Sequence, residues 1–310
     1  MKVLVTGADG FVGRHLLNEL VNHGHEVIAT SLHAGTLETA RARLELHALD
    51  VANPDACNSI TSLHQPDAAV HLAGLAHTKD TEKNLRQLFD VNVASVSHVA
   101  NAVKNLPGGR NRSFLMISSA FVYGGDLKTG NLSCHESTPV VPRGSYGQSK
   151  LAAESVARLY DGNGLDVYVA RPFNHIGPGQ HPSFVVAGFA ERIMKAANGS
   201  SIETGGLHSH RDFTDVRDIA RAYRLILEKQ PEEKTFVLGS GKSVTIGYVF
   251  EEMCRLAKKS LTTKTRDDLV RSGDESSLLG DASLAARVLG WHPEISLSKS
   301  LSDVLDSLTL

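Results

Sequence analysis

The sequence is poor in cysteine, with Cys57, Cys134 and Cys254 standing far apart among 310 residues. An odd count without a CxxC pair argues against a disulfide scaffold or a zinc module and favours a reducing compartment. No apolar run approaches the roughly 18–20 residues that a membrane span needs. The run Val3–Val5 leads straight into a glycine turn, so it is too short for the core of a signal peptide. We therefore expect a cytoplasmic protein without a membrane partner.

An excess of charge is also absent. The formal net charge is −2, which gives no reason to expect nucleic acid as a partner. Hydrophobic residues make up 41% and charged residues 21% of the chain, which is ordinary globular usage and excludes a disordered chain. A chain of this length buries about three quarters of its surface on folding, enough for a full core without metal or disulfide bonds.

Short β-rich runs alternate with helical patterns through the first half of the chain. Strands are predicted at Lys2–Thr6, Glu26–Thr30, Leu46–Asp50, Ala68–Leu72, Phe114–Ser118 and Asp166–Arg171. Helices are predicted at Phe11–His23, Pro54–Leu63, Glu82–Asn105 and Tyr146–Tyr160. Strand–helix alternation with apolar strands indicates an α/β fold, a Rossmann-type doubly wound parallel sheet with helices on both faces.

A glycine-rich turn, GADGFVG, follows the first predicted strand directly. It places Gly7, Gly10 and Gly13 in a GxxGxxG spacing, with Phe11 and Val12 between the last two. Glycines let the backbone approach a pyrophosphate, which then sits at the positive end of the next helix. The alternative is a purely structural strand–helix turn; the place of the motif, after strand one and opening a helix, favours a dinucleotide.

The end of the second strand indicates which dinucleotide binds. An acid there would accept hydrogen bonds from the adenosine ribose and repel a 2′-phosphate, but the segment reads VIATSLHAG. Ser31 and His33 stand in place of the acid, and Arg41 and Arg43 follow. This pattern favours NADP(H), with NAD(H) as the alternative. Asp50–Val51, at the end of the third strand, is expected to flank the adenine.

A second constellation carries acid–base groups. Tyr146 and Lys150 are four residues apart, and so they share one face of a helix. Ser118 and Ser119 end a predicted strand, which places them at the carboxyl edge of the sheet, where open α/β sheets bind ligands. Asn92 lies in the long helix before that strand. A surface tyrosine beside a surface lysine is the alternative for this common spacing.

These motifs together resemble the extended short-chain dehydrogenase/reductases that act on nucleotide sugars. The resemblance covers nearly the whole chain and rests on TGADGFVG, HLAG (His71–Gly74), Asn92, SSAFVYG, Tyr146-x-x-x-Lys150 and RPFN (Arg171–Asn174). It implies an NAD(P)-binding domain over residues 1–172, to which segments near 211–240 return, and a mainly substrate-binding lobe over 173–310. Helices are expected in the second region near Phe184–Ala197, Asp215–Glu228 and Ile246–Lys258.

The resemblance implies a role for each acid–base residue. Tyr146 would be the general acid/base, and Lys150 would lower its pKa while holding the nicotinamide ribose. Ser119 would bond the reacting oxygen, and Asn92 would shape its helix and relay protons. The cofactor would also contact a further three residues of the HLAG segment: Leu72, Ala73 and Gly74. A homodimer is expected through the helices Glu82–Asn105 and Tyr146–Tyr160.

The residues after Ser119 narrow the reaction. The family's 4,6-dehydratases carry an Asp–Glu pair there, whereas this chain has Ala120 and Phe121, neither of which can transfer a proton. A 4-ketoreductase or a 4-epimerase remains. Epimerases usually carry an acid after strand two, so its absence favours the reductase. A non-catalytic NADP(H) sensor is the alternative from another class, and the presence of both Tyr146 and Lys150 disfavours it.

Downstream motifs concern the substrate. RPFNHIGPGQ and RDFTDVRD resemble those of the GDP-6-deoxy-D-mannose reductases, which make GDP-D-rhamnose. By that resemblance Asn174 contacts the diphosphate region, and Arg211 contacts a phosphate or the nucleotide. Arg271 would bind the diphosphate and Asp274 a ribose. The alternative for both arginines is solvation at the surface. Ser277 stands where these reductases often have arginine, so GDP, dTDP and UDP all remain open as the nucleotide.

Overall fold

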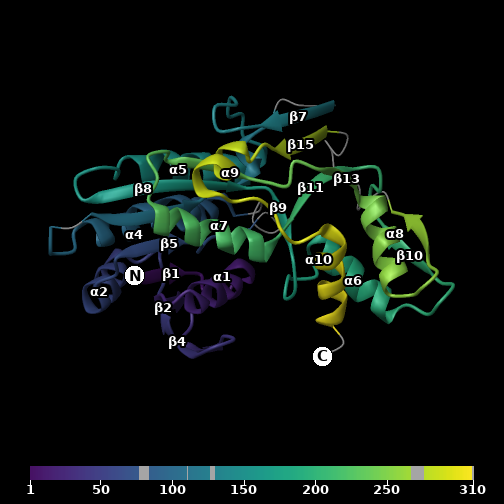
Figure 1. Cartoon of the computed structure of the whole chain (residues 1–310), viewed down its shortest axis with the longest axis horizontal. Helices are drawn as coiled ribbons and strands as arrows, with labels where there is room; N and C mark the ends of the chain where they lie inside the picture. Colours follow the sequence, from purple (N-terminus) through teal and green to yellow (C-terminus); the bar gives the residue numbers. More distant parts are fainter. Residues whose placement is uncertain (77–83, 110, 126–129, 267–275, 309–310) are drawn as a thin grey trace.

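The structure is a computed structural model that describes residues 1–76, 84–109, 111–125, 130–266 and 276–308. Its centre is an eight-stranded sheet in the order β12-β8-β6-β5-β1-β2-β4-β3 (Figure 1). The strands are β1 (Lys2–Thr6), β2 (Glu26–Ser31), β3 (Gly35–Glu38), β4 (Arg43–Ala48), β5 (Ala68–His71), β6 (Arg112–Ile117), β8 (Leu165–Pro172) and β12 (Thr235–Leu238). Every neighbouring pair is parallel except β3–β4.

Helices cover both faces of this sheet, which confirms the predicted doubly wound α/β fold. One face carries α1 (Phe11–Asn22), α7 (Val216–Lys229) and α9 (Ser283–Leu289), and the other carries α2 (Pro54–His64), α4 (Ser95–Lys104) and α5 (Gly144–Arg158). Side chains of a strand alternate between the faces: Val3 and Val5 pack in the first core and Leu4 in the second. A strand buried on both sides needs a continuous apolar run, which is the pattern of β1.

The predicted long helix over 82–105 is interrupted in the structure. Within the described residues it consists of α3 (Leu85–Phe89), a π turn η2 (Asp90–Ala94) and α4. The predicted strand Leu46–Asp50 is β4, which begins three residues earlier and ends two residues earlier. The sequence did not predict its antiparallel partner β3, because β3 is short, mostly exposed and without an apolar run.

The second lobe has its own small core beside the sheet. Its elements are β9 (Asn174–Ile176), α6 (Val185–Lys195), β10 (Ser201–Thr204), β11 (His210–Asp215), β13 (Ser243–Thr245), α8 (Ile246–Leu256), β14 (Thr262–Thr265) and α10 (Leu297–Asp306). A short 3₁₀ turn η3 (Ala120–Val122) and the parallel pair β7 (Gly130–Cys134) and β15 (Ser276–Gly280) complete the described elements. No described helix could span a membrane.

Part of the chain beyond residue 172 belongs to the first layer. β12 extends the large sheet by pairing with β8, and α7 packs against α1. The chain thus passes from the sheet into the second lobe and back again. The division at residue 172 itself stays a prediction.

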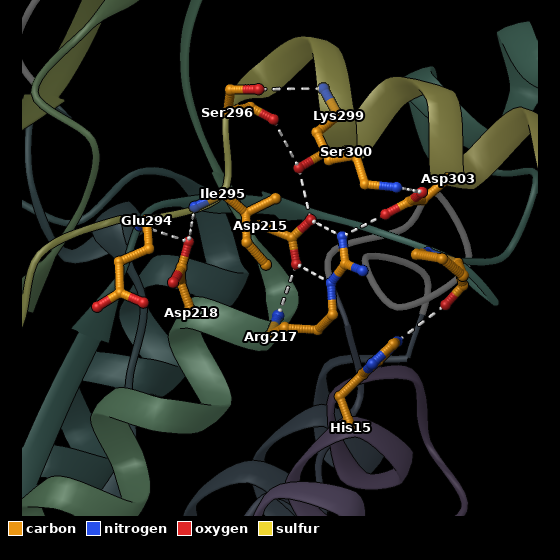
Figure 2. Close-up of polar contacts among 11 residues, drawn as sticks. His15, Asp215, Arg217, Asp218, Glu294, Ile295, Ser296, Lys299, Ser300 and Asp303 are labelled. Carbon is orange, nitrogen blue, oxygen red and sulfur yellow. Dashed lines mark hydrogen bonds and ion pairs between the residues drawn. The ribbon is translucent and has the colours of Figure 1, made fainter. Parts of the chain in front are cut away.

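A polar cluster fastens α10 to the start of α7 (Figure 2). The buried Asp215 carboxylate accepts hydrogen bonds from the Arg217 backbone and guanidinium and from the Ser300 hydroxyl, and Arg217 also reaches Asp303 at 2.7 Å. On the neighbouring α1, the His15 ring donates to the Pro178 carbonyl at 2.9 Å. These contacts anchor the second lobe to the helices that cover the first.

Candidate active site

The glycine turn is too tight for any other residue at two positions. Gly7 has φ +68°, and a Cβ there would lie 2.9 Å from the Ala73 nitrogen. A Cβ on Gly13 would lie 2.4 Å from the Gly7 carbonyl oxygen. The helix α1 that follows has Gly10 as its N-cap, with no side-chain cap and no acid in its first turn. Its positive end and the close backbone therefore fit a pyrophosphate.

At the end of β2, Ser31 and His33, which the sequence predicts beside the adenosine ribose of the cofactor, form a local turn. The buried Ser31 hydroxyl donates to the His33 carbonyl at 2.8 Å, while the His33 side chain is exposed. Asp50 is exposed and accepts from the Ala52 nitrogen, and the Val51 carbonyl accepts from the His98 ring at 3.0 Å. Neither Ser31 nor His33, the residues at the end of β2, is an acid.

Arg41 and Arg43, which follow Ser31 and His33 in the sequence, do not lie near the end of β2. Arg41 donates to the Asn22 carbonyl, at the far end of α1. Arg43 begins β4, whose Ala48 pairs with Ser31. Arg43 is therefore five residues before Ala48 along β4, which corresponds to about 17 Å from the end of β2. Because the chain runs back antiparallel through β3, both arginines lie at the amino ends of the parallel strands, away from the end of β2.

The structure brings Tyr146, Lys150 and Ser119 together at the carboxyl edge. The Tyr146 phenol is hydrogen-bonded to the Ser119 hydroxyl. The Lys150 ammonium donates to the Ile117 carbonyl at 2.9 Å and lies 5.9 Å from the centre of the Tyr146 ring. A Cβ on Gly74 would lie 3.7 Å from the Lys150 nitrogen, so the segment after β5 joins this group to the glycine turn.

Burial sets the proton affinities of this group. It raises the pKa of Tyr146 to about 12, against the hydrogen bond from Ser119, which lowers it. It lowers the pKa of Lys150 to about 8, against the charge of Glu154, which raises it. In this state the phenol is protonated at neutral pH, so it can give a proton to an alkoxide. The expectation that Lys150 lowers the pKa of Tyr146 stays a prediction.

Asn92 sits in the π turn η2 and is buried. Its side-chain oxygen accepts from the Leu75 nitrogen at 2.7 Å, and its amide group donates to the Leu75 carbonyl and to the Ser149 hydroxyl, both at 3.2 Å. The Ser149 hydroxyl in turn donates to the Tyr146 carbonyl. Asn92 therefore connects the segment after β5 to the helix α5. Nothing in the sequence pattern indicates the π turn or the part that Ser149 plays.

His71, at the end of β5, is a buried polar residue whose partners were not predicted. Its two ring nitrogens lie 2.9 Å from the hydroxyls of Thr6 and Ser95. Burial, together with the nearby Lys150 charge, lowers its pKa to about 3, so the ring is neutral. His71 thus ties β5 to β1 and α4 beneath the glycine turn.

The predicted substrate residues lie on strands of the second lobe. Asn174 on β9 donates to the Asp212 carbonyl at 3.3 Å, and the half-buried Arg211 on β11 donates to the His210 carbonyl. The His175 ring stacks on Phe11 with 6.1 Å between centroids, which brings β9 against the glycine turn. Arg271 and Asp274 lie outside the described residues.

The buried Asp212 is a further residue that the motifs did not single out. Its carboxylate accepts hydrogen bonds from three backbone nitrogens, those of Ser240, Gly241 and Gly280, and from the Ser240 hydroxyl. It therefore joins β11, which carries Arg211, to β15 and to the chain after β12. Among the described residues no group of three His, Cys, Asp or Glu side chains is placed to hold a metal ion.

Two features of this doubly wound sheet lie side by side: the glycine turn at the uncapped N-terminus of α1, and the group formed by Ser119, Tyr146 and Lys150. Together they define an NAD(P)-dependent oxidoreductase of the short-chain type. The chain belongs to the family described as GDP-mannose 4,6 dehydratase, whose model matches residues 4–304. The relatives that this chain resembles include nucleotide-sugar reductases, epimerases and dehydratases.

Relatives with known activities cover nearly the whole chain. It is 31% identical over 309 residues to GDP-6-deoxy-D-mannose reductase from Pseudomonas aeruginosa, covering 98% of this chain and 96% of that one. It is 28% identical to GDP-6-deoxy-D-talose 4-dehydrogenase from Aggregatibacter actinomycetemcomitans, covering 94% and 92%. The solved structure of RMD from Pseudomonas aeruginosa complexed with NADPH matches with a TM-score of 0.83 at 30% identity, over 99% of this chain and 98% of that one.

Proposed function

We propose that the chain is an NADPH-dependent 4-ketoreductase of a nucleotide-linked 4-keto-6-deoxy sugar, similar to the GDP-6-deoxy-D-mannose reductases that make GDP-D-rhamnose. The observation that carries this is the pair of residues after Ser119. Ala120 is buried, and the Phe121 ring packs edge-on against Tyr146 with 5.7 Å between centroids. The side chains of Ala120 and Phe121 therefore occupy the positions at which a dehydratase needs an acid and a base to remove water. Without them, the reaction that the site supports is oxidation or reduction at one carbon.

In this reaction NADPH would supply a hydride to C4 of the sugar. Tyr146 gives its phenolic proton to the resulting oxyanion, which the pKa of about 12 allows because the phenol is protonated beforehand. Ser119, hydrogen-bonded to the phenol, holds the oxygen in place. The Lys150 ammonium stabilises the tyrosinate that is left behind, since an opposite charge nearby favours the ionised form.

The glycine turn and the segment after β5 would hold the cofactor. Gly7, Gly10 and Gly13 admit its pyrophosphate, with the first helical residues Phe11 and Val12. Leu72, Ala73 and Gly74 follow β5 beside the turn, and Lys150 would reach the nicotinamide ribose. Ser31 and His33, with no acid at the end of β2, support NADPH over NADH.

Arg211 and Asn174 are the residues of the described chain that we assign to the nucleotide diphosphate. Both lie on the adjacent strands β11 and β9, where Asn174 pairs with Phe213, two residues after Arg211. Arg271 and Asp274 are assigned to the diphosphate and a ribose. Ser277 is buried and lies 3.3 Å from the Ser243 hydroxyl, so no guanidinium stands at that position.

The reaction type can be tested with purified protein. GDP-4-keto-6-deoxy-mannose with NADPH should consume the nicotinamide absorbance and yield a C4 alcohol, while GDP-mannose should give no 4-keto-6-deoxy product. Formation of that product would show a dehydratase, and interconversion of C4 epimers without net oxidation of NADPH would show an epimerase. Thermal shifts with GDP, UDP and dTDP identify the nucleotide, because a ligand stabilises the fold by mass action.

We also propose that the protein is a cytoplasmic homodimer. A shallow apolar groove runs between the π turn and the end of α5, lined by Phe89, Val93, Val156 and Leu159. Phe89 is 39% and Leu159 80% exposed, and apolar side chains gathered in this way are typical of an interface. Leu159→Glu should convert the dimer into a monomer in light scattering, and an unchanged mass would exclude this surface. The three cysteines are buried and unpaired, as suits the cytoplasm.

A further inference from the structure

One turn beyond Lys150, α5 carries a buried carboxylate that the proposed mechanism does not use. Glu154 is held by Arg171 through two hydrogen bonds, Nε to Oε1 at 2.9 Å and Nη2 to Oε2 at 2.6 Å. The two side chains are 3% and 7% exposed. The Ser118 hydroxyl donates to the same carboxylate at 2.5 Å. This is a two-pronged, fully enclosed ion pair, the strongest geometry that a guanidinium offers.

The pair joins the elements that carry the acid–base group. Glu154 belongs to α5, as do Tyr146 and Lys150. Ser118 immediately precedes Ser119, and Arg171 is the last residue but one of β8. The remaining Arg171 nitrogen donates to the Tyr123 hydroxyl at 2.7 Å. The Tyr123 hydroxyl in turn donates to the His135 carbonyl. The network therefore fixes α5 against the carboxyl ends of β6, which Ser118 follows, and of β8, which carries Arg171.

Charge is the second reason to single out Glu154. Among the described residues, the titratable groups that act on the Lys150 ammonium or lie beside it are Glu154 and Tyr146 on its own helix and His71 on β5. The cations Arg171 and, at 3.9 Å, Arg158 face the Glu154 carboxylate. His71 is neutral and Tyr146 is protonated, so neither supplies negative charge. Glu154 raises the pKa of Lys150 against the burial that lowers it. A buried ammonium without such a partner would lose its proton more readily.

We propose that Glu154, clamped by Arg171, is a positioning residue for the reductase: it sets the place of α5 against Ser118–Ser119 and keeps the Lys150 ammonium charged. This rests on the proposed function, in which that ammonium stabilises the tyrosinate. The Arg171 guanidinium pairs with the carboxylate, and the field of Glu154 falls on Lys150 one turn away.

A purely structural ion pair is the competing explanation. Removing one partner of a buried pair strongly destabilises a protein whatever its role, so a lower melting temperature does not decide between the two. The deciding quantity is the pKa of Lys150 itself. It can be followed by NMR through the ¹³Cε signal of labelled lysine, assigned with Lys150→Met, and this measurement needs no substrate.

Glu154→Gln keeps the shape and removes the charge. We expect the Lys150 titration to move down by about one pH unit, with the alkaline limb of kcat following it and kcat falling about fivefold at pH 8. Glu154→Asp keeps the charge and should keep the titration near that of the wild type. Glu19→Gln is the matched control, since Glu19 forms a partly buried pair with Arg224 at 2.8 Å between α1 and α7; its Lys150 titration should not move.

An unmoved Lys150 titration in Glu154→Gln would overturn the proposal. Should Glu154→Gln fail to fold, Ser118→Ala tests the positioning alone, because it removes only the hydrogen bond to the carboxylate. We expect a severalfold lower kcat with an unchanged KM for NADPH, and a wild-type kcat would overturn the positioning role. If the wild type reduces no sugar but its Lys150 titration still depends on Glu154, the proposed function fails and the electrostatic part of the inference stands.

Discussion

The Asn92 side-chain amide donates a hydrogen bond to the Ser149 hydroxyl across 3.2 Å, and so ties the π turn to the helix that carries Tyr146 and Lys150. The same side chain binds both the nitrogen and the carbonyl oxygen of Leu75. One residue therefore fixes the distance between the segment after β5 and α5. A π turn adds a residue to the helix and turns this side chain inward, a device that is frequent at functional sites.

Asn92→Ala should weaken both the fold and the reaction. It leaves the two Leu75 backbone groups without their partner, which should lower the free energy of unfolding by about 1–3 kcal/mol. We expect kcat to fall more than KM, because the segment that borders Lys150 loosens. Urea unfolding and steady-state kinetics check this. Asn101→Ala, on the exposed side of α4, is the matched control and should change neither quantity.

Tyr146→Phe should reduce kcat by at least ~10²-fold, since it removes only the proton that the phenol transfers. The affinity for NADPH, measured by fluorescence titration, should stay nearly unchanged. Tyr168→Phe is a suitable control, because Tyr168 lies on β8 and its hydroxyl is 3.5 Å from the Lys234 nitrogen rather than at Ser119. Near-wild-type turnover of Tyr146→Phe would contradict the assigned role.

His33→Asp should shift the cofactor preference. An acid on the exposed loop after β2 would repel a 2′-phosphate and should lower kcat/KM for NADPH by about tenfold, which corresponds to about 1.4 kcal/mol of repulsion. The value for NADH should hold or rise. Arg41→Ala should leave the NADPH-to-NADH ratio unchanged, because Arg41 lies at the far end of α1. A fall in that ratio for Arg41→Ala would contradict the geometry.

Acid should destabilise the fold through His71. Its pKa is about 3 in the folded chain, against 6.5 for an ordinary histidine. The unfolded chain takes up a proton below pH 6.5 and the folded chain does not until about pH 3, so stability falls as the pH drops through that window. At pH 5 the loss is about 2 kcal/mol.

Unfolding free energies from pH 7 to 4 test this prediction. The free energy of unfolding should fall less steeply with decreasing pH in His71→Gln than in the wild type. This difference in slope is independent of the stability that the variant loses at pH 7 with the hydrogen bonds to Thr6 and Ser95. His23→Gln, on the outer side of α1, controls for the loss of an imidazole. An equal slope in wild type and His71→Gln would show that other groups govern acid unfolding.

Much of the first half of the fold could be predicted, because its signals are local. β1, α1 and the glycine turn follow from an apolar run, a helical period and glycine spacing, and the confirmed doubly wound sheet follows from their alternation. The path through β3 could not be predicted, since Gly35–Glu38 has no apolar face. That path decides where Arg41 and Arg43 lie, so their closeness to Ser31 in the sequence does not bring them near the end of β2.

The candidate site divides in the same way. Tyr146 and Lys150 could be placed on one helix face from their spacing alone. Their surroundings depend on contacts between distant segments, such as Glu154 with Arg171 and Asn92 with Leu75, which no local pattern encodes. The raised pKa of Tyr146 also comes from burial, which spacing does not reveal. The roles of the site residues stay predictions until the variants are measured.

The late return of β12 to the large sheet has a consequence for how the chain is made. Until Thr235–Leu238 leaves the ribosome, β8 is an open edge whose backbone groups await a partner. The residues between β8 and β12, which include β9, α6, β10 and β11 of the second lobe, are synthesised before this partner strand. The nascent first lobe therefore cannot close on its own, and a fragment that stops at residue 172 should need the chaperones that shield exposed strand edges.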